Sequence, residues 1–235
     1  MLPPVSSIKR IFDKSSDKGD TCLVVGTSPE NWDSVNPFPV RSIGMHPWQL
    51  HLYSQNNHWL ADMEARLQQD PALGVGEIGL DKNARAPITS QIPAFQAQML
   101  LAAKYNRRVS IHCVRTHGHL LAVFQSMIAE NDNVGLPKRI YMHAWSGSVQ
   151  VTETLLRMKF PRNRPKLFFG LCVRHSKIIV FDQVVGKNQI LVESDLPFDD
   201  PARKDYLIRA LELLPKLSVE NIWTNFKELT LPVST

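Results

Sequence analysis

The stretch ALGVGEIG at residues 72–79, followed by Leu80 and Asp81, decides between two α/β folds for this sequence. Its glycines have the density of a phosphate-binding loop, but they lie inside an apolar β-strand. An open nucleotide-binding sheet carries such glycines in the turn after its first strand. No Gly-rich turn follows the first predicted strand, TCLVVG (21–26), and no Walker-type GxxxxGK[ST] segment occurs. The stretch therefore favours a barrel, in which functional residues lie at the carboxyl ends of several strands.

Seven short apolar or β-branched runs predict the strands of a mainly parallel sheet that is covered on both faces. They are TCLVVG (21–26), VRSIGM (40–45), ALGVGEIG (72–79), RRVSIHC (107–113), RIYMHAW (139–145), KLFFGLCV (166–173) and QILVES (189–194). Segments with apolar residues at helical spacing lie between them and predict helices over residues 56–69, 91–105, 119–130, 149–159 and 205–216. This alternation predicts βα units in a single domain that spans residues 1–235.

The composition sets limits on the compartment and the partner. The 235 residues carry a formal net charge of +5, which permits a phosphate-bearing partner because basic side chains release counterions from phosphates. Three separated cysteines, Cys22, Cys113 and Cys172, lack zinc-finger spacing and suit a reducing compartment. No apolar run reaches the roughly 18 residues of a membrane helix. We therefore expect an intracellular protein of the cytoplasm or nucleus, with no membrane partner.

Four of the predicted strands end in side chains of the kind that bind metals. These are Glu77, His112, His143 and the pair Glu193 and Asp195. Any one of them alone is more often structural, as a hydrogen-bonded histidine or a buried ion-pair partner. In a barrel they would converge at one mouth, which the carboxyl ends of the strands form. Carboxylates and imidazoles are ligands that suit Zn, Mn, Mg or Fe.

Several segments, in chain order, resemble the motifs of the TatD family of metal-dependent deoxyribonucleases. They are GMHPW (44–48), GEIGLD (76–81), IHCVR (111–115), HAWSG (143–147), ESDLP (193–197) and TNF (224–226). The HAWSG and IHCVR variants are most similar to a fungal branch of TatD-like proteins. The resemblance extends over most of the chain. It implies an amidohydrolase-like (βα)8 barrel of the TIM type, with a site for one or two divalent ions at its mouth.

The resemblance also implies roles for the residues at the strand ends. On this basis Glu77 binds or bridges metal, and His112 and His143 bind a second ion. Asp195 binds metal and orients or deprotonates the attacking water, so that Asp195 and Glu77 are the expected catalytic residues. Mg, Mn or Zn is the expected ion, with one or two per site.

Three further residues are expected around these ligands. Glu193 lies beside Asp195 in the sequence, and the forked donors of Arg115 are placed to hold a phosphate oxygen. His46 contacts substrate or supports a ligand. A surface ion pair for Arg115 and a loop-fixing role for His46 are the structural alternatives.

The chain departs from the family pattern at its start. TatD-like proteins begin with a strand that carries His-x-His, the ligands of the first metal, and no such segment precedes residue 21. Residues 6–20 are predicted to form a helix and a turn, and MLPPV (1–5) is too proline-rich to replace the strand. We therefore expect a barrel without its first strand and with an exposed edge between strands two and eight. Such an edge favours self-association, a protein partner or low stability.

Three explanations of this departure stay open. The chain is truncated or mis-started, it has lost the metal pair and is weakened or inactive, or MLPPV or a partner chain closes the gap. Three functions compete accordingly. The first is a deoxyribonuclease that cleaves phosphodiester bonds of DNA with a metal-activated water. The others are a hydrolase of another small ester or amide, and a catalytically inactive scaffold or interaction protein.

Overall fold

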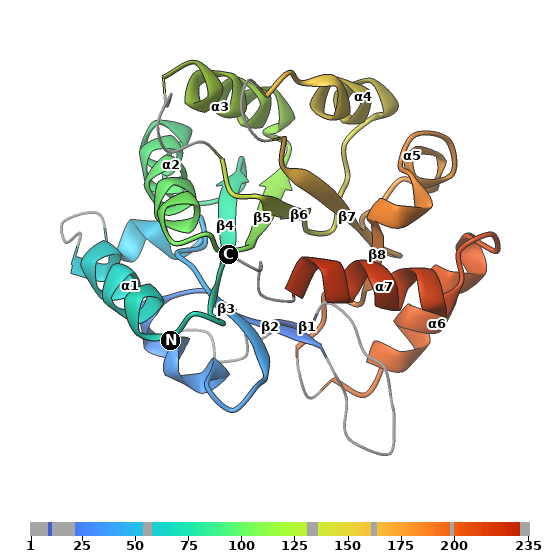
Figure 1. The fold of residues 1–235 in the computed structure, drawn as a ribbon, viewed down its shortest axis with the longest axis horizontal. Helices are drawn as coiled ribbons and strands as arrows, with labels where there is room; N and C mark the ends of the chain where they lie inside the picture. The colour runs from blue at the N-terminus through green and yellow to red at the C-terminus, as the bar shows by residue number, and fades with distance from the viewer. Residues whose placement is uncertain are drawn as a thin grey trace.

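A curled sheet of seven parallel strands forms the centre of the protein (Figure 1). The computed structural model describes residues 9–10, 22–53, 58–130, 136–160, 164–197 and 200–230. The parallel strands follow one another in chain order: β2 (Leu23–Gly26), β3 (Val40–Ile43), β4 (Gly74–Asp81), β5 (Val109–Val114), β6 (Arg139–Met142), β7 (Lys166–Cys172) and β8 (Ile190–Glu193). All seven predicted strands are confirmed, with ends that differ by a few residues.

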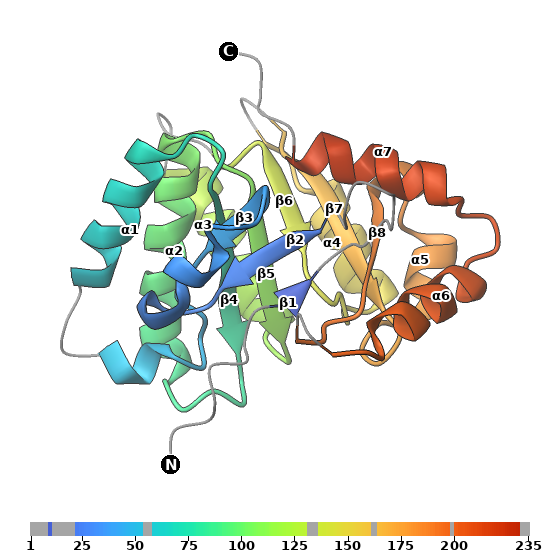
Figure 2. The same cartoon turned by 90° about the horizontal axis from the view of Figure 1, so that it is seen from below.

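Helices surround this sheet on its outer side, as Figure 2 shows. They are α1 (His58–Gln69), α2 (Ile88–Lys104), α3 (His117–Glu130), α4 (Val149–Arg157), α5 (Ile178–Gln183), α6 (Arg203–Leu213) and α7 (Val219–Thr230). Short 3-10 helices are η1 (Pro29–Asn31), η2 (Asp33–Val35), η3 (Leu50–Tyr53) and η4 (Lys187–Gln189). The five predicted helices are confirmed. None of the helices in the described ranges combines the length and apolar character that a bilayer crossing requires.

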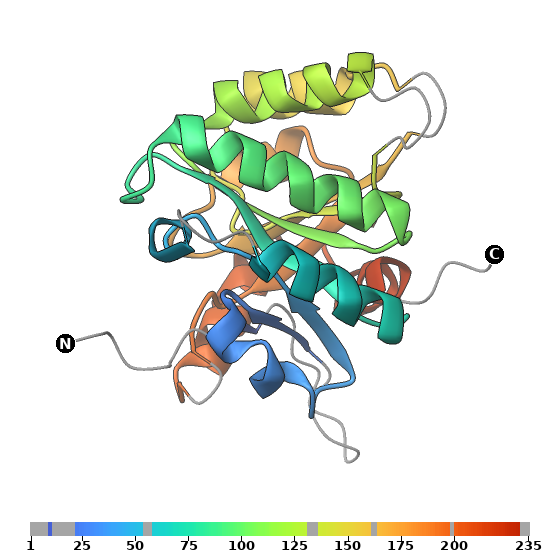
Figure 3. The same ribbon diagram turned by 90° about the vertical axis from the view of Figure 1, so that its left-hand side faces the viewer.

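The helices bury one stripe each against the sheet. In α1, Trp59, Met63 and Leu67 follow one another at four-residue spacing and are buried, which is the pattern of a helix with a single apolar face. Figure 3 shows α1, α2 and α3 lying side by side along one flank. The strands are buried on both faces, and every residue of β4 is buried. This two-sided burial is typical of a parallel sheet that helices cover.

The start of the sheet differs from the sequence-based prediction. Lys9 and Arg10 form β1 (Lys9–Arg10), which pairs antiparallel with β2 through Lys9–Val25 and Arg10–Val24. At these two positions the predicted helix is therefore wrong, because extended backbone pairs with the free edge of β2. The rest of residues 6–20, and MLPPV (1–5), lie outside the described residues. Within the described residues, no ladder joins β8 to β1 or β2, so the sheet is curled but not closed.

Candidate metal centre

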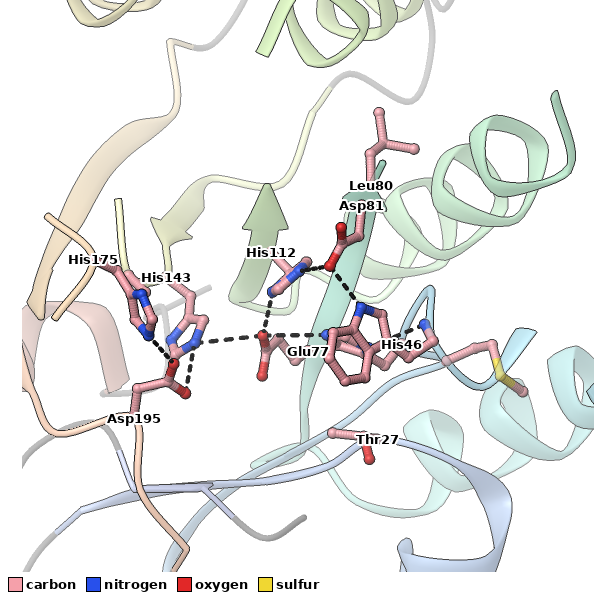
Figure 4. Close-up of polar contacts among 12 residues, drawn as sticks. Thr27, His46, Glu77, Leu80, Asp81, His112, His143, His175 and Asp195 are labelled. Carbon is pink, nitrogen blue, oxygen red and sulfur yellow. Dashed lines mark hydrogen bonds and ion pairs between the residues drawn. The ribbon is translucent and has the colours of Figure 1, made fainter. Parts of the chain in front are cut away.

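Glu77 lies at the centre of a polar cluster at the carboxyl end of the sheet (Figure 4). Its side chain comes from the middle of β4 and is 1% exposed. Its Oε1 is 2.9 Å from Nδ1 of His112, 3.4 Å from Nε2 of His143 and 3.5 Å from Nε2 of His46. One carboxylate oxygen thus faces three imidazoles from three neighbouring parts of the sheet.

A glycine before Glu77 and another after it let β4 lie close to β5. Gly76 and Gly79 have φ angles of 150° and 144°, which side chains disfavour. A Cβ at Gly76 would lie 2.7 Å from Cβ of Ser110, and one at Gly79 would collide with the carbonyl oxygen of His112. The glycines that have the density of a phosphate-binding loop therefore serve close strand packing. This packing brings Glu77 against the His112 side chain.

His112 is held between two carboxylates. Its Nδ1 faces Glu77, and its Nε2 is 3.0 Å from Oδ2 of Asp81, the last residue of β4. The indole Nε1–H of Trp48 donates to the same Asp81 oxygen at 2.6 Å, and the backbone N–H of Asn83 donates to Oδ1 at 2.7 Å. Burial raises the pKa of Asp81, but the hydrogen bonds from His112, Asn83 and Trp48 outweigh it and lower the pKa to about 2.

His143 is arranged in the same way, with the roles of its nitrogens exchanged. Its Nδ1 is 3.0 Å from Oε2 of Glu193, while its Nε2 is 3.4 Å from Oε1 of Glu77 and 3.2 Å from Oδ1 of Asp195. Burial disfavours the charged imidazole, but the carboxylates of Glu193, Glu77 and Asp195 raise the pKa of His143 well above its usual value.

Glu193 is fixed by donors on β6 and just after it. The backbone N–H of Ala144 donates to Oε1 at 2.6 Å, and the hydroxyl of Tyr141 donates to Oε2. Burial and the adjacent Glu193 raise the pKa of Tyr141 well above its usual value, so the hydroxyl keeps its proton. Glu193 is therefore an acceptor for three donors and orients His143.

Asp195 lies at the open side of the cluster and is 11% exposed. Its Oδ2 is 3.5 Å from Nε2 of His175, which follows β7 (Figure 4). The sulfur of Cys172, a nitrogen of His175 and an oxygen of Asp195 all lie within 4.8 Å of one another, as do ligand atoms of His46, Glu77 and His112.

Backbone strain concentrates at this end of the sheet. Of the four described residues other than glycine with positive φ, Arg115, Ala144 and Asp195 follow β5, β6 and β8, with φ angles of 54°, 40° and 52°. The fourth, Asn106, lies just beyond the end of α2, where such a conformation is common. Strained residues persist where the surrounding structure holds them, and they cluster at functional sites.

The structure brings together six of the seven residues that the sequence predicts for the site. They are His46, Glu77, His112, His143, Glu193 and Asp195. His46 also has the loop-fixing role, because its Nδ1 accepts the backbone N–H of Trp48 at 3.2 Å. Arg115 is exposed beyond β5 and forms no ion pair with any residue in the described ranges.

Four residues of the cluster were missed by sequence reasoning. Asp81 ends the GEIGLD segment and is the last residue of β4, so the strand-end rule also covers its carboxylate. Trp48 ends GMHPW, where a tryptophan gives no such signal. Cys172 and His175 lie at the end of the predicted strand KLFFGLCV (166–173) and just after it. The rule that polar residues at strand ends mark the site would have found His175 had it been applied to that strand.

The donor set fits a divalent cation. His112 and His143 each present one ring nitrogen to Glu77 and the other to a buried carboxylate, Asp81 or Glu193. Metal-binding histidines have this arrangement, because the outer carboxylate holds the ring proton and leaves the inner nitrogen free to coordinate. With Asp195, the residues that face the centre are imidazoles and carboxylates, ligands of Zn, Mn and Mg.

Known proteins share this chain's sequence pattern and fold. A family model described as "TatD related DNase" matches residues 6–222. The "Cut9-interacting protein scn1" of Schizosaccharomyces pombe is 28% identical over 213 residues, which are 72% of this chain and 62% of that protein. The "3'-5' ssDNA/RNA exonuclease TatD" of Edwardsiella piscicida is 32% identical over 117 residues, which are 49% of this chain and 42% of that protein.

A solved relative shows the likeness in three dimensions. YjjV of Escherichia coli, named as an uncharacterized metal-dependent hydrolase, is 28% identical over 187 residues, which are 74% of this chain and 67% of that protein. Its crystal structure matches with a TM-score of 0.69 at 23% identity, over 88% of this chain and 85% of that chain. The chain spans less than two thirds of the length of the scn1 and Edwardsiella relatives. Because the family model covers residues 6–222, this chain belongs to the family of TatD-related DNases.

Proposed function

We propose that this chain is a divalent-metal-dependent phosphodiesterase that hydrolyses DNA or a similar nucleic acid strand. The observation that carries the proposal is the paired arrangement of His112 and His143. Each turns one nitrogen to the central Glu77 and the other to a buried carboxylate. Metal-binding histidines are arranged in this way, which supports a cation-binding role in addition to a structural one.

The residues divide into holding, positioning and proton-accepting groups. Glu77, His112 and His143 would hold the ion, for which Mg, Mn and Zn are the candidates. Asp81 and Glu193 position the two imidazoles. When bound, the ion lowers the pKa of a coordinated water and stabilises charge that develops on the phosphate.

Asp195 is the group proposed to take the proton of the attacking water. It is 11% exposed, whereas the side chains of Glu77 and Glu193 are 1% and 0% exposed. It can therefore reach a water at the mouth of the site, and a positioned carboxylate within hydrogen-bond distance acts as a general base.

Trp48 supports a nucleic acid as the substrate. Trp48 is 55% exposed, and its indole N–H is fixed on Asp81, next to the histidine cluster. An exposed aromatic ring offers a surface on which an unpaired base can stack. The net charge of +5 and the exonuclease name of the Edwardsiella relative agree with a single-stranded end as the substrate.

A non-catalytic interaction role is the second candidate. The name of the fission yeast relative describes a protein interaction. Within the described ranges, the edge of β2 is paired only with the two-residue β1, so part of this edge is open to a partner strand or a second copy.

The test is a cleavage assay with a labelled single-stranded DNA, with Mg or Mn and with a chelator. We expect metal-dependent cleavage, and a loss of at least about 100-fold in kcat/KM for His143→Ala. The matched control is His119→Ala, because His119 is exposed on α3. A parallel assay with a carboxylester separates a phosphodiesterase from an esterase. Absent cleavage by the folded wild type, or full activity of His143→Ala, would overturn the proposal.

A further inference from the structure

We infer that Cys172, His175 and Asp195 form a second cation site beside the Glu77 cluster, one that selects a thiolate-binding ion such as zinc. This site shares Asp195 with the proposed phosphodiesterase site. It does not depend on phosphodiester cleavage, because its ligand set differs and its occupancy has its own spectroscopic readout.

The end of β7 aims the sulfur of Cys172 at this place. Cys172 is the last residue of β7 and is 0% exposed. Side chains two apart on a strand point to the same side, and a Cβ on Gly170 would meet Tyr141 and Glu193 inside the sheet. The sulfur therefore points to the interior, where it lies 3.8 Å from the carbonyl oxygen of Ser194.

A tight turn after β7 fixes His175 relative to Cys172. The backbone N–H groups of His175 and Ser176 donate to the carbonyl of Cys172 at 3.1 and 2.9 Å. The backbone N–H of Cys172 donates to the hydroxyl of Ser176 at 3.0 Å, and that hydroxyl donates to the carbonyl of Gly170 at 3.2 Å. The Cys-x-x-His pair is thus held by the backbone before any ligand arrives.

Asp195, just after the neighbouring strand β8, completes the set. Its Oδ2 is 3.5 Å from Nε2 of His175, and its Oδ1 is 3.2 Å from Nε2 of His143, so each cluster faces one oxygen. The three donor atoms of the new site lie within 4.8 Å of one another. Two ligands that each lie about 2.0–2.3 Å from one tetrahedral zinc ion are roughly 3.3–3.8 Å apart, so small side-chain movements suffice to bind the ion.

The chemistry of the ligands separates the two sites. The Glu77 cluster offers only nitrogen and oxygen, whereas Cys172 adds a thiolate, which favours zinc over Mg or Ca. A bound cation deprotonates a coordinating thiol. Three protein ligands leave a fourth position for water or substrate, and the 47% exposure of His175 places that position toward solvent.

The experiment is a titration of the metal-free full chain with Co²⁺, followed by absorption spectroscopy. Cobalt bound by a thiolate gives a charge-transfer band in the near ultraviolet, which nitrogen and oxygen ligands do not give. We expect this band in the wild type, its loss in Cys172→Ser with cobalt still bound at the Glu77 cluster, and at least about 10-fold weaker binding in His175→Ala. Added zinc should abolish the band.

Cys113→Ser is the matched control. Cys113 is also a buried cysteine, near the end of β5, and its sulfur lies 3.5 Å from the hydroxyl of Thr116 outside this ligand group. It should keep the band. Cobalt binding without a thiolate band overturns this inference and leaves the proposed function standing. A thiolate band in a protein without nuclease activity supports this inference and overturns the proposed function.

Discussion

The two ends of the same strands carry opposite charge and use it differently. The amino ends carry cations: Arg41 in β3, Arg108 just before β5, Arg139 at the start of β6 and Lys166 at the start of β7. The carboxyl halves of the strands, and the residues just after them, carry carboxylates: Glu77, Asp81, Glu193 and Asp195. The partners of these groups explain which end is structural and which is suited to function.

Two of the cations at the amino ends, Arg108 and Arg139, bind backbone carbonyls of neighbouring elements, whereas Lys166 pairs with Glu228. Arg108 donates to the carbonyls of Ala72 and Arg41 at 3.0 and 2.6 Å. Arg139 donates to the carbonyls of Glu228 and Leu229, at the end of α7, at 2.9 and 3.1 Å. Cations at helix carboxyl ends offset the negative end of the helix dipole. This end therefore ties helices to the sheet.

The carboxylates at the other end face ionisable side chains instead. Glu77 and Asp81 face the two ring nitrogens of His112, and Glu193 and Asp195 face those of His143. Negative charge gathers in a buried place, and nearby backbone adopts positive φ at residues that disfavour it. Such an arrangement is suited to a bound cation, and it agrees with the location of active sites in barrels.

The largest predicted effect is that of Glu77→Gln at the carboxyl end. The amide keeps the shape of the side chain but removes the central negative charge, so cation binding and cleavage should both fall. We expect at least a 100-fold loss of kcat/KM, within the range that acid–base and ligand groups contribute. Circular dichroism should show a folded chain. A kcat/KM within a few-fold of the wild-type value would contradict a role of Glu77 in metal binding and cleavage.

Arg139→Met tests the amino end. It removes two hydrogen bonds and a charge from the last carbonyls of α7. We expect the free energy of unfolding to fall by about 1–3 kcal/mol, measured by urea denaturation. Activity per folded molecule should stay the same. A large loss of kcat with unchanged stability would contradict the structural role.

The pH dependence of stability should differ between the metal-free and metal-bound protein. The raised pKa of His143 means that its contribution is fully present below its unfolded pKa of about 6.5 and is lost as pH rises through the folded pKa. The metal-free chain should therefore be less stable at about pH 8 than at about pH 6. Because a cation replaces the proton, Mn should raise the Tm more at the higher pH. Equal shifts at both values would contradict this.

Lys166→Met should have the smallest effect. Lys166 pairs with Glu228, and the side chains are 30% and 47% exposed. Exposed ion pairs contribute at most about 1 kcal/mol, so its urea midpoint should lie close to wild type and well above that of Arg139→Met. Equal losses of unfolding free energy in the two variants would mean that the carbonyl hydrogen bonds of Arg139 stabilise the fold no more than an exposed ion pair does.

The strands and the central residues of the cluster were predictable because a parallel sheet puts the carboxyl ends of its strands together. That rule alone places Glu77, His112, His143 and Asp195 in one cluster. The antiparallel pairing of Lys9 and Arg10 was not predictable, because two charged residues carry no strand pattern and the edge of β2 decides their conformation. Side-chain contacts between elements far apart in the sequence were not predictable either, because the fold decides which elements meet.

Two helices of the structure, α5 and α7, were not predicted from the apolar spacing of the sequence. The apolar spacing of α7 did not lead to a prediction, although the TNF segment (224–226) lies within this helix. Its buried Asn225 donates to the carbonyls of Lys187 and Ile190 at 2.7 and 2.8 Å, a contact made across the fold. The six-residue α5 was also missed, because a segment of this length has too few turns for a periodic pattern.

The most direct test of the central claim is anomalous diffraction from crystals grown with Mn²⁺ or Zn²⁺. The account predicts a peak within coordination distance of Glu77, His112 and His143, and no peak there in crystals of Glu77→Gln. A well-ordered wild-type cluster with no peak at saturating metal would contradict the account, because the paired histidines and carboxylates would then stabilise one another without an ion.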